Sequence, residues 1–287
     1  MGGLLHSEDR FIRSVVRQIG SEEDALEVAD RLVRNTDRAD DAARFEAVSR
    51  SGLLAIATPA AFGGADVTNA TLAEIVRRFA AEDPPEAHRL VSHFVASEII
   101  RNAGGDAYAV FQRVAAGARL IAVLEEAGGG TVPLPARHAG GQGTDADGAD
   151  IDVWFVILRR ESSGLPLVRM VRDRRTGDDL LDGSFLDIDT SALPLVKVLS
   201  QLLKAGVFLG ELERLKQRGD AARGERTVMI VSETISALVQ RVGAALDLAQ
   251  VSPSDRTITE AARLAEVLDH VRQRCARSPG ADFDLSS

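Results

Sequence analysis

One histidine in this sequence, His93, is a candidate for proton transfer to a bound molecule. His93 lies in an apolar stretch, about residues 86–102, whose spacing predicts a helix that ends at a glycine pair. Because a histidine gains or loses a proton near neutral pH, His93 could donate to a bound molecule. The alternative is a hydrogen-bonded core residue, the commoner state of a lone histidine on an apolar helix.

The sequence shows neither the ligand spacing of a metal site nor the glycine pattern of a nucleotide-binding site. His88 precedes His93 by five positions, which is not the i, i+4 spacing of paired ligands, so we expect no metal site. Two glycine-rich segments, AGGG and GGQG, lack the strand-to-helix context of a dinucleotide fingerprint, and no Walker-type loop occurs. The single cysteine, Cys275, predicts a reducing cytoplasm because it cannot form an internal disulfide.

The composition narrows the classes of partner. The chain has 287 residues, 45% of them hydrophobic, and a formal net charge of -9. An acidic surface repels phosphate, so we expect neither nucleic acid nor an anionic membrane as partner. The N-terminus has no signal-peptide pattern, and we expect no apolar run long enough to span a membrane, so we predict a cytoplasmic protein. Its partners are expected to be small molecules or other proteins.

The elements that would hold His93 fall into three regions. Helical spacing dominates residues 1–117 and returns in residues 191–287, while residues 118–190 carry glycine-rich turns and strand-like runs. Within that middle region, 151–158 and 165–171 predict a β-hairpin. We interpret these regions as an N-terminal helical domain, a reduced β domain with a glycine-rich loop, and a C-terminal helical domain.

Helix starts are predicted from capping patterns. The segment Thr71–Glu74 has the sequence of a capping box before an apolar run. Ser21 precedes three acidic residues and predicts another helix start. For the last helix, Thr257 or Thr259 is the expected cap before Glu260.

The connection GLLAIATPAAFGG at 52–64 and the helix after it, to Pro84, carry a recognisable pattern. Glycine can end a helix, proline fixes an extended turn, and the Gly-Gly pair can adopt positive φ. The stretch resembles the acyl-CoA dehydrogenase superfamily, with matches at Gly52, Leu53, Pro59, Phe62, Gly63, Gly64, Leu72, Ala73, Glu74, Ala80, Asp83 and Pro84. The resemblance covers about the first 130 residues and is closest to the branch of flavin-dependent organosulfur monooxygenases.

This resemblance implies an α+β, mostly α fold. It would comprise an N-terminal helical domain, a reduced central β segment and a shortened C-terminal helical bundle. It also implies FAD or FMN as cofactor, with a histidine facing the flavin at His93 and an acyl pocket lined by Phe94. The flavin loop of the family corresponds to a segment whose candidate contacts are Leu124, Glu126, Gly128, Gly129 and Thr131.

Three parts of the family pattern are altered here. The flavin loop lacks the family's proline and serine, so its glycines either present backbone N–H groups to flavin or form a plain turn. The strand and aromatic turn that normally contact flavin are replaced by residues 145–150. The family's catalytic glutamate is not found: Ser200 and Gln201 stand at one of its positions, and Glu211 and Glu213 are expected to be solvated.

Two functions follow from the resemblance. The first is a divergent, non-catalytic subunit that forms a homo-oligomer or packs against a full-length acyl-CoA dehydrogenase-like subunit. Such a subunit either supplies part of a flavin site or has lost the flavin. The alternative is an FAD- or FMN-dependent dehydrogenase or monooxygenase acting on an acyl thioester or a small organosulfur substrate. We expect the first because losses at three independent places agree.

Overall fold

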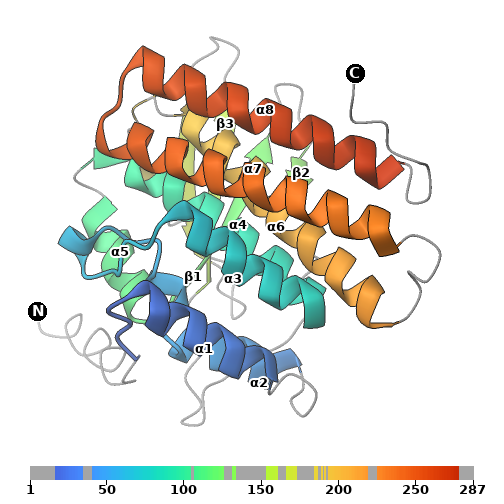
Figure 1. The fold of residues 1–287 in the computed structure, drawn as a ribbon. Coiled ribbons are helices and arrows are strands. Elements are labelled where there is room, and N and C mark those ends of the chain that lie inside the picture. The colour runs from blue at the N-terminus through green and yellow to red at the C-terminus, as the bar shows by residue number, and fades with distance from the viewer. Residues whose placement is uncertain are drawn as a thin grey trace, which may run out of the picture. The chain divides into compact units, whose positions relative to one another are not determined.

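Figure 1 shows the chain as a computed structural model in which helices predominate. The residues it describes are 17–34, 41–104, 107–125, 131–133, 153–160, 166–172, 184–186, 189, 191, 193–218 and 225–277. The expected mostly helical α+β class is confirmed.

Contacts divide the chain into two compact units, each built from two separated stretches. The first unit comprises Met1–Val67 and Ser92–Thr190, and the second comprises Thr68–Val91 and Ser191–Ser287. Helix α4 (Pro84–Arg101) contributes residues to both units. The interpretation as three consecutive domains stays a prediction.

Short helices and turns make up the helical part of the first unit. Its described helices besides the end of α4 are α1 (Glu22–Arg34), α2 (Asp41–Arg50), η3 (Leu53–Ala55), η4 (Ala60–Phe62) and α5 (Ala107–Ala115). The predicted start of α1 is confirmed, because the Ser21 hydroxyl accepts a hydrogen bond from the backbone N–H of Asp24 at 3.1 Å. Acidic residues fill the first turn of α1 and basic residues its last turn, which suits the helix dipole.

A five-stranded sheet forms the other part of the first unit. Its spatial order is β2-β1-β3-β4-β5, and its strands are β1 (Arg119–Glu125), β2 (Thr131–Pro133), β3 (Val153–Arg160), β4 (Pro166–Arg172) and β5 (Ser184–Leu186). The predicted hairpin is confirmed as the antiparallel pair β3–β4, whereas β1 pairs with β3 in parallel. We did not predict β1, because its apolar run RLIAVLE does not alternate and resembles a buried helix segment as much as a strand.

Long helices form the second unit. They are α3 (Asn69–Glu82), the beginning of α4, α6 (Leu193–Gln217), α7 (Glu225–Val251) and α8 (Asp255–Arg277). Glycine lets α6 approach the backbone of α3: a Cβ at Gly206 would lie 2.5 Å from the carbonyl oxygen of Ala73, and one at Gly210 would lie 2.6 Å from the Cβ of Ala80. Such distances are shorter than real Cβ contacts, so both positions require glycine at this separation of the helices.

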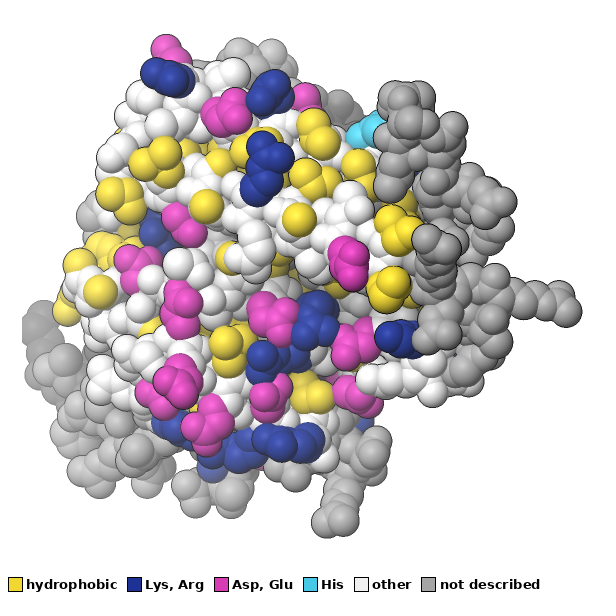
Figure 2. Space-filling view, viewed as in Figure 1, with side chains coloured by type: hydrophobic (Ala, Val, Ile, Leu, Met, Phe, Trp, Pro, Cys, Tyr) yellow, Lys and Arg dark blue, Asp and Glu magenta, His cyan; other side chains and the backbone are white. Residues whose placement is uncertain are grey.

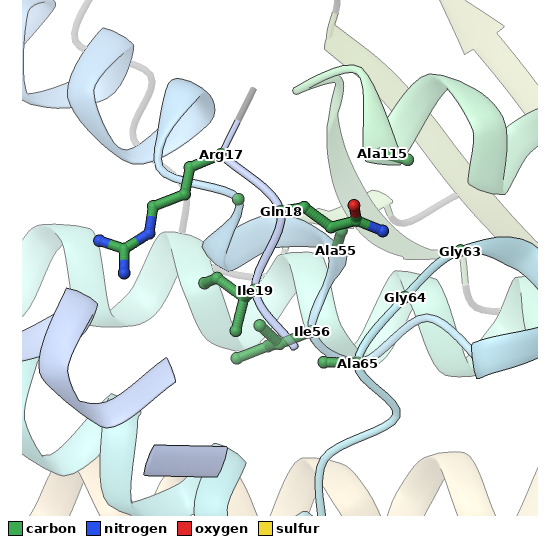
Figure 3. A pocket seen from close by; sticks show the side chains of 10 residues that line it. Arg17, Gln18, Ile19, Ala55, Ile56, Gly63, Gly64, Ala65 and Ala115 are labelled. Atoms are coloured by element: carbon green, nitrogen blue, oxygen red, sulfur yellow. The ribbon is translucent and has the colours of Figure 1, made fainter. Parts of the chain in front are cut away.

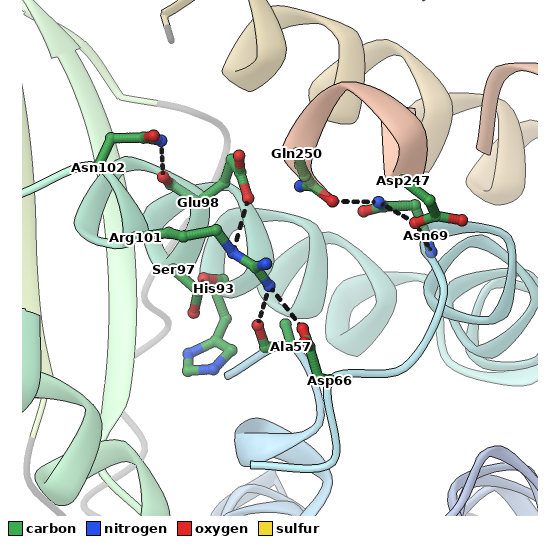
Figure 4. Close-up of polar contacts among 10 residues, drawn as sticks. All are labelled: Ala57, Asp66, Asn69, His93, Ser97, Glu98, Arg101, Asn102, Asp247 and Gln250. Carbon is green, nitrogen blue, oxygen red and sulfur yellow. Dashed lines mark hydrogen bonds and ion pairs between the residues drawn. The ribbon is translucent and has the colours of Figure 1, made fainter. Parts of the chain in front are cut away.

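A carboxylate on α7 binds the first turn of α3. Oδ1 of Asp247 accepts hydrogen bonds from the backbone N–H of Asn69 at 3.0 Å and from its side-chain amide at 2.6 Å (Figure 4). The same amide donates to Oε1 of Gln250 at 2.8 Å. A negative charge at a helix N-terminus also interacts favourably with the helix dipole, so this contact fixes α7 against α3.

Two of the predicted helix caps are corrected by the structure. Helix α3 begins at Asn69 with Thr68 as its N-cap, whose hydroxyl accepts from the N–H of Thr71, so the capping box expected at Thr71–Glu74 is wrong. For α8 the N-cap is Ser254, whose hydroxyl accepts from the N–H of Thr257 at 3.2 Å. Thr257 instead makes the reciprocal bond, accepting the N–H of Ser254 at 3.0 Å.

Two helices of the second unit meet the length and hydropathy of a membrane span. They are Leu193–Gln217 and Val228–Val251, which corrects the expectation that no apolar stretch reaches that length. In the apolar window of the first, 61% of residues are buried within the protein, as in the core helix of a soluble protein. In the second only 28% are buried, so α7 leaves much of its apolar surface uncovered.

Candidate functional site

The connection between α2 and α3 is a tightly packed turn, as its sequence indicates. Gly52 (φ 82) and Gly63 (φ 87) adopt left-handed backbone. Gly64 lies directly over the preceding turn, because a Cβ there would fall onto the carbonyl oxygen of Thr58. A hydrogen bond from the N–H of Val67 to the carbonyl of Ile56 at 3.1 Å closes the segment. Two backbone carbonyls of this turn, those of Leu54 and Ala57, bond side chains of α4.

A surface pocket of about 180 Å³ opens beside this turn (Figure 3). In Figure 3 the Gln18 side chain points toward the glycine pair, whereas the Arg17 side chain points away from it. Arg17 forms an ion pair with Asp24 at 3.8 Å. The residues that line the pocket are Arg17, Gln18, Ile19, Gly52, Ala55, Ile56, Gly63, Gly64, Ala65 and Ala115.

His93 lies in the core of the first unit, and both of its ring nitrogens have backbone partners. Nε2 lies 2.9 Å from the carbonyl oxygen of Leu54, in the turn, and Nδ1 accepts a hydrogen bond from the N–H of Leu120, in β1, at 2.9 Å. Because Nδ1 accepts, the proton of the neutral ring is on Nε2, which donates to Leu54. His93 thus joins α4 to the turn on one side and to the sheet on the other.

The protonation state of His93 follows from its surroundings. Its side chain has no solvent exposure, and burial lowers the pKa of His93 to about 4. The hydrogen bond that the ring donates to the carbonyl of Leu54 opposes this shift, whereas the positive charge of Arg119 adds to it. A neutral ring with both nitrogens occupied has none left for a flavin or a substrate, which favours the structural interpretation of His93 over the catalytic one.

Ser92 continues the attachment of α4 to β1. Its hydroxyl accepts a hydrogen bond from the N–H of Ala122 at 3.0 Å. Leu120 and Ala122 are two residues apart, so their N–H groups point to the same edge of the strand. The pairing with β2 begins only at Val123, and the side chains of Ser92 and His93 therefore replace a neighbouring strand along the first half of that edge. We did not predict this role for Ser92; the only signal was two adjacent polar residues in an apolar helix.

The other sequence-predicted site residues are distributed as follows. Phe94 is fully buried, and its ring lies edge-on to His93 with centroids 5.6 Å apart. Leu124 lies in β1 and Thr131 in β2, and Leu124 is paired with Val132 across the hairpin. Glu126, Gly128 and Gly129 lie outside the described residues. The predicted flavin and pocket contacts therefore stay predictions.

Arg101 fixes the end of α4 to the same turn (Figure 4). Its guanidinium donates to the carbonyl of Ala57 at 2.8 Å and to the carboxylate of Asp66 at 3.1 Å. Glu98, one turn earlier, pairs with the guanidinium at 3.4 Å. Together with His93, these contacts hold the turn at two points along α4.

Carboxylates of the second unit are held by arginines. Glu213 is 41% exposed and pairs with Arg77 of α3. Glu74 accepts from the side chains of Arg77 and Arg78, and although burial raises the pKa of Glu74, these hydrogen bonds outweigh it and hold that pKa below its usual range. Glu74 and Glu213 therefore act as ion-pair partners. Within the described stretches no three metal-ligating side chains come together.

Comparison with known proteins identifies the fold. No family model and no curated protein matches the sequence. The methanesulfinate monooxygenase MsuC from Pseudomonas fluorescens is 17% identical, with a TM-score of 0.59 and an alignment that covers 92% of this chain and 86% of that chain. The dibenzothiophene monooxygenase TdsC from Paenibacillus sp. A11-2 is 16% identical, with a TM-score of 0.53 and coverage of 87% and 83%.

A nitrososynthase from Micromonospora carbonacea var. africana gives a similar result, at 16% identity, a TM-score of 0.54 and coverage of 94% and 84%. The protein therefore has the acyl-CoA dehydrogenase-like fold, as the resemblance implied, and shares it with flavin-dependent monooxygenases. At these identities the likeness establishes the fold and not the reaction.

Proposed function

We propose that this chain is a non-catalytic subunit with the acyl-CoA dehydrogenase-like fold, working in an assembly with a flavin-dependent oxidoreductase. The observation that carries the proposal is the position of His93. Its imidazole bonds Leu54 and Leu120 in the core, at 2.9 Å each, instead of presenting a nitrogen to a ligand. Phe94 beside it is enclosed as well.

The carboxylates add further support. A dehydrogenase of this fold would need a base within hydrogen-bond reach of the carbon that loses its proton. Glu213 is engaged by Arg77 instead. Of the residues predicted to contact flavin, the described strands supply only the backbone positions Leu124 and Thr131. Neither of these two residues offers a side chain that the structure fits to a flavin.

A second function is favoured by the structural neighbours. TdsC has been solved with FMN bound, and its alignment covers 87% of this chain and 84% of that chain. A chain that keeps the fold over this extent could also keep a flavin site, in the segment that joins β1 to β2. In that case the protein is an FAD- or FMN-dependent oxidoreductase acting on an acyl thioester or a small organosulfur compound.

Flavin binding separates the two functions. The purified protein is examined by visible absorption, alone and after addition of FMN or FAD followed by removal of the excess. We expect a colourless protein that retains no flavin. Stoichiometric retention would overturn the non-catalytic proposal. Its loss on substitution Gly128→Val, with the fold preserved by circular dichroism, would then place the flavin at the predicted loop.

A further inference from the structure

The surface pocket beside the turn between α2 and α3 is a feature of the first unit alone. All of its lining residues belong to that unit, and none of them is a predicted flavin or acyl contact. Its volume of about 180 Å³ is sufficient for one small ring, since a cavity of about 150 Å³ accommodates benzene. Figure 2 shows a different part of the surface, where acidic and basic side chains lie close together and neutralise each other.

The walls of the pocket combine apolar side chains with bare backbone (Figure 3). Ile19 and Ile56 supply apolar surface, and Gly63 and Gly64 leave their peptide groups uncovered by side chains. A Cβ at Gly63 would meet nothing within 4 Å, so the space beside this residue is open. Such walls suit the faces of a small planar ring, which buries apolar surface against them.

Two hydrogen-bonding groups of the walls have no partner within the described stretches. The carboxamide of Gln18, which points toward the glycine pair in Figure 3, is one of them. The backbone N–H of Ala65 is the other, although the N–H groups of its neighbours Gly64 and Asp66 donate to carbonyls of the same turn. A carboxamide offers a donor and an acceptor side by side, so it pairs with a ligand edge of the same kind.

The charges around the pocket favour an uncharged ligand. Arg17 is the only charged residue among the described residues that line it, and its guanidinium points away from the glycine pair and pairs with Asp24 at 3.8 Å. The chain as a whole has a net charge of -9, which repels anions. A carboxylate or phosphate would therefore lose hydration here without gaining a counter-charge.

The turn that forms one wall is fixed from the side of α4. The carbonyls of Leu54 and Ala57, on either side of two pocket residues, bond His93 and Arg101. A wall held in this way loses little conformational freedom when a ligand binds, so even a small molecule can be retained.

We propose that this pocket binds a small, uncharged, planar molecule that carries a carboxamide or an equivalent donor–acceptor edge. The ring of the molecule lies against Ile19 and Ile56, and its polar edge pairs with the carboxamide of Gln18. The N–H of Ala65 donates to a remaining acceptor of the ligand. Binding is noncovalent and requires no flavin.

Benzamide is the probe for this site, and acetophenone is its matched control, because it has a methyl group in place of the amide nitrogen. Titration of the isotope-labelled protein, followed by backbone amide chemical shifts, should show saturable changes at Gln18, at Gly63–Ala65 and at Ala115. We expect a dissociation constant of about 1–10 mM for benzamide, as for other ligands of this size. Acetophenone should bind about tenfold more weakly, since it lacks the donor that Gln18 accepts.

Two variants separate the polar contact from the space. Gln18→Met keeps the length of an exposed side chain but removes its hydrogen bonds, so benzamide should bind about tenfold more weakly and no better than acetophenone. Ala115→Leu should fill the pocket and abolish binding of both probes. Ala109→Leu, at an exposed position of the same helix outside the pocket, is the matched control and should bind as the wild type does.

Three results would overturn the proposal: no saturable shifts at the pocket amides, equal affinity for benzamide and acetophenone, or benzamide binding unchanged in Gln18→Met. Because Gln18 is exposed, its variant decides the outcome even where Ala115→Leu does not fold. Flavin retention is measured separately, so a failure of the non-catalytic proposal leaves this site standing.

Discussion

Two adjacent polar side chains of α4 stabilise the fold by hydrogen bonds to the backbone. Ser92 and His93 accept the N–H groups of Ala122 and Leu120, and His93 also donates to the turn at Leu54. A buried donor or acceptor without a partner costs about 1–3 kcal/mol, so these side chains stabilise a strand edge that no other described strand covers along this half. The sequence left the core and catalytic interpretations of His93 open, and its distant hydrogen-bond partners favour the core interpretation.

Replacement of His93 should therefore destabilise the protein. His93→Ala leaves the carbonyl of Leu54 and the N–H of Leu120 unpaired in the core, and we expect a loss of about 3 kcal/mol or more at pH 7, measured by urea unfolding. His88→Ala, at an exposed position of the same helix, is the control. Wild-type stability in His93→Ala would instead favour a functional histidine.

The pH dependence of stability gives a second readout of the same contact. Burial lowers the pKa of His93 from 6.5 to about 4, so the unfolded chain binds a proton more readily than the folded one. The stabilisation from the neutral ring is complete above pH 6.5 and is lost as the pH falls toward 4, by about 3 kcal/mol in total. The difference in unfolding free energy between wild type and His93→Ala should shrink over this range.

At the scale of elements, the turn between α2 and α3 shows two different reasons for glycine. Gly63 has left-handed backbone but open space around it, whereas Gly64 lies against the preceding turn, where a Cβ would fall 2.6 Å from the carbonyl oxygen of Ala55. The aromatic ring of Phe62 stacks on Phe111 of α5, with centroids 5.3 Å apart, and holds the turn from the other side.

The two glycines should respond differently to the same substitution. Gly63→Ala should cost about 1–2 kcal/mol, the strain of a left-handed residue with a side chain. Gly64→Ala should cost more, about 3 kcal/mol or above, because the backbone of the turn must move to admit a methyl group. Thermal unfolding of both variants measures the difference, and equal losses would contradict the packing described for Gly64.

Local sequence patterns predicted the helices and strands better than they predicted which elements pair with each other. The Ser21 cap, the β3–β4 hairpin and the helical spacing of α7 are encoded within a few residues, and all three are observed. The parallel pairing of β1 with β3 depends on residues more than thirty positions apart, and nothing near β1 specifies it. The start of α3 was misplaced because Thr71 has the same local chemistry as the true cap, Thr68.

At the scale of the whole molecule, each unit has its own core but neither is continuous in sequence. Helix α3 packs against α6 and α7, although the intervening stretch from Ser92 to Thr190 belongs to the other unit. Contacts in the second unit therefore link residues 68–91 to the last third of the chain. Stability in this unit should be shared by its two stretches.

Hydrogen exchange can test whether the two stretches of the second unit share their stability. Gly206→Ala forces α6 away from the backbone of α3, so we expect amides of both helices to lose protection together. Amides of β1 and β3, in the first unit, should keep theirs. Gly20→Ala, where a Cβ meets nothing within 4 Å, is the matched control. Faster exchange confined to α6 would contradict a shared unit.

The discontinuous second unit also constrains how the protein can form during translation. Between Glu82 and Leu193 lie 110 residues, and at about 5–20 residues per second the ribosome needs about 5–20 seconds to make them. During that interval α3 has been made, but the helix α6 that packs against it has not. Nascent chains paused in this window should be the species that chaperones hold.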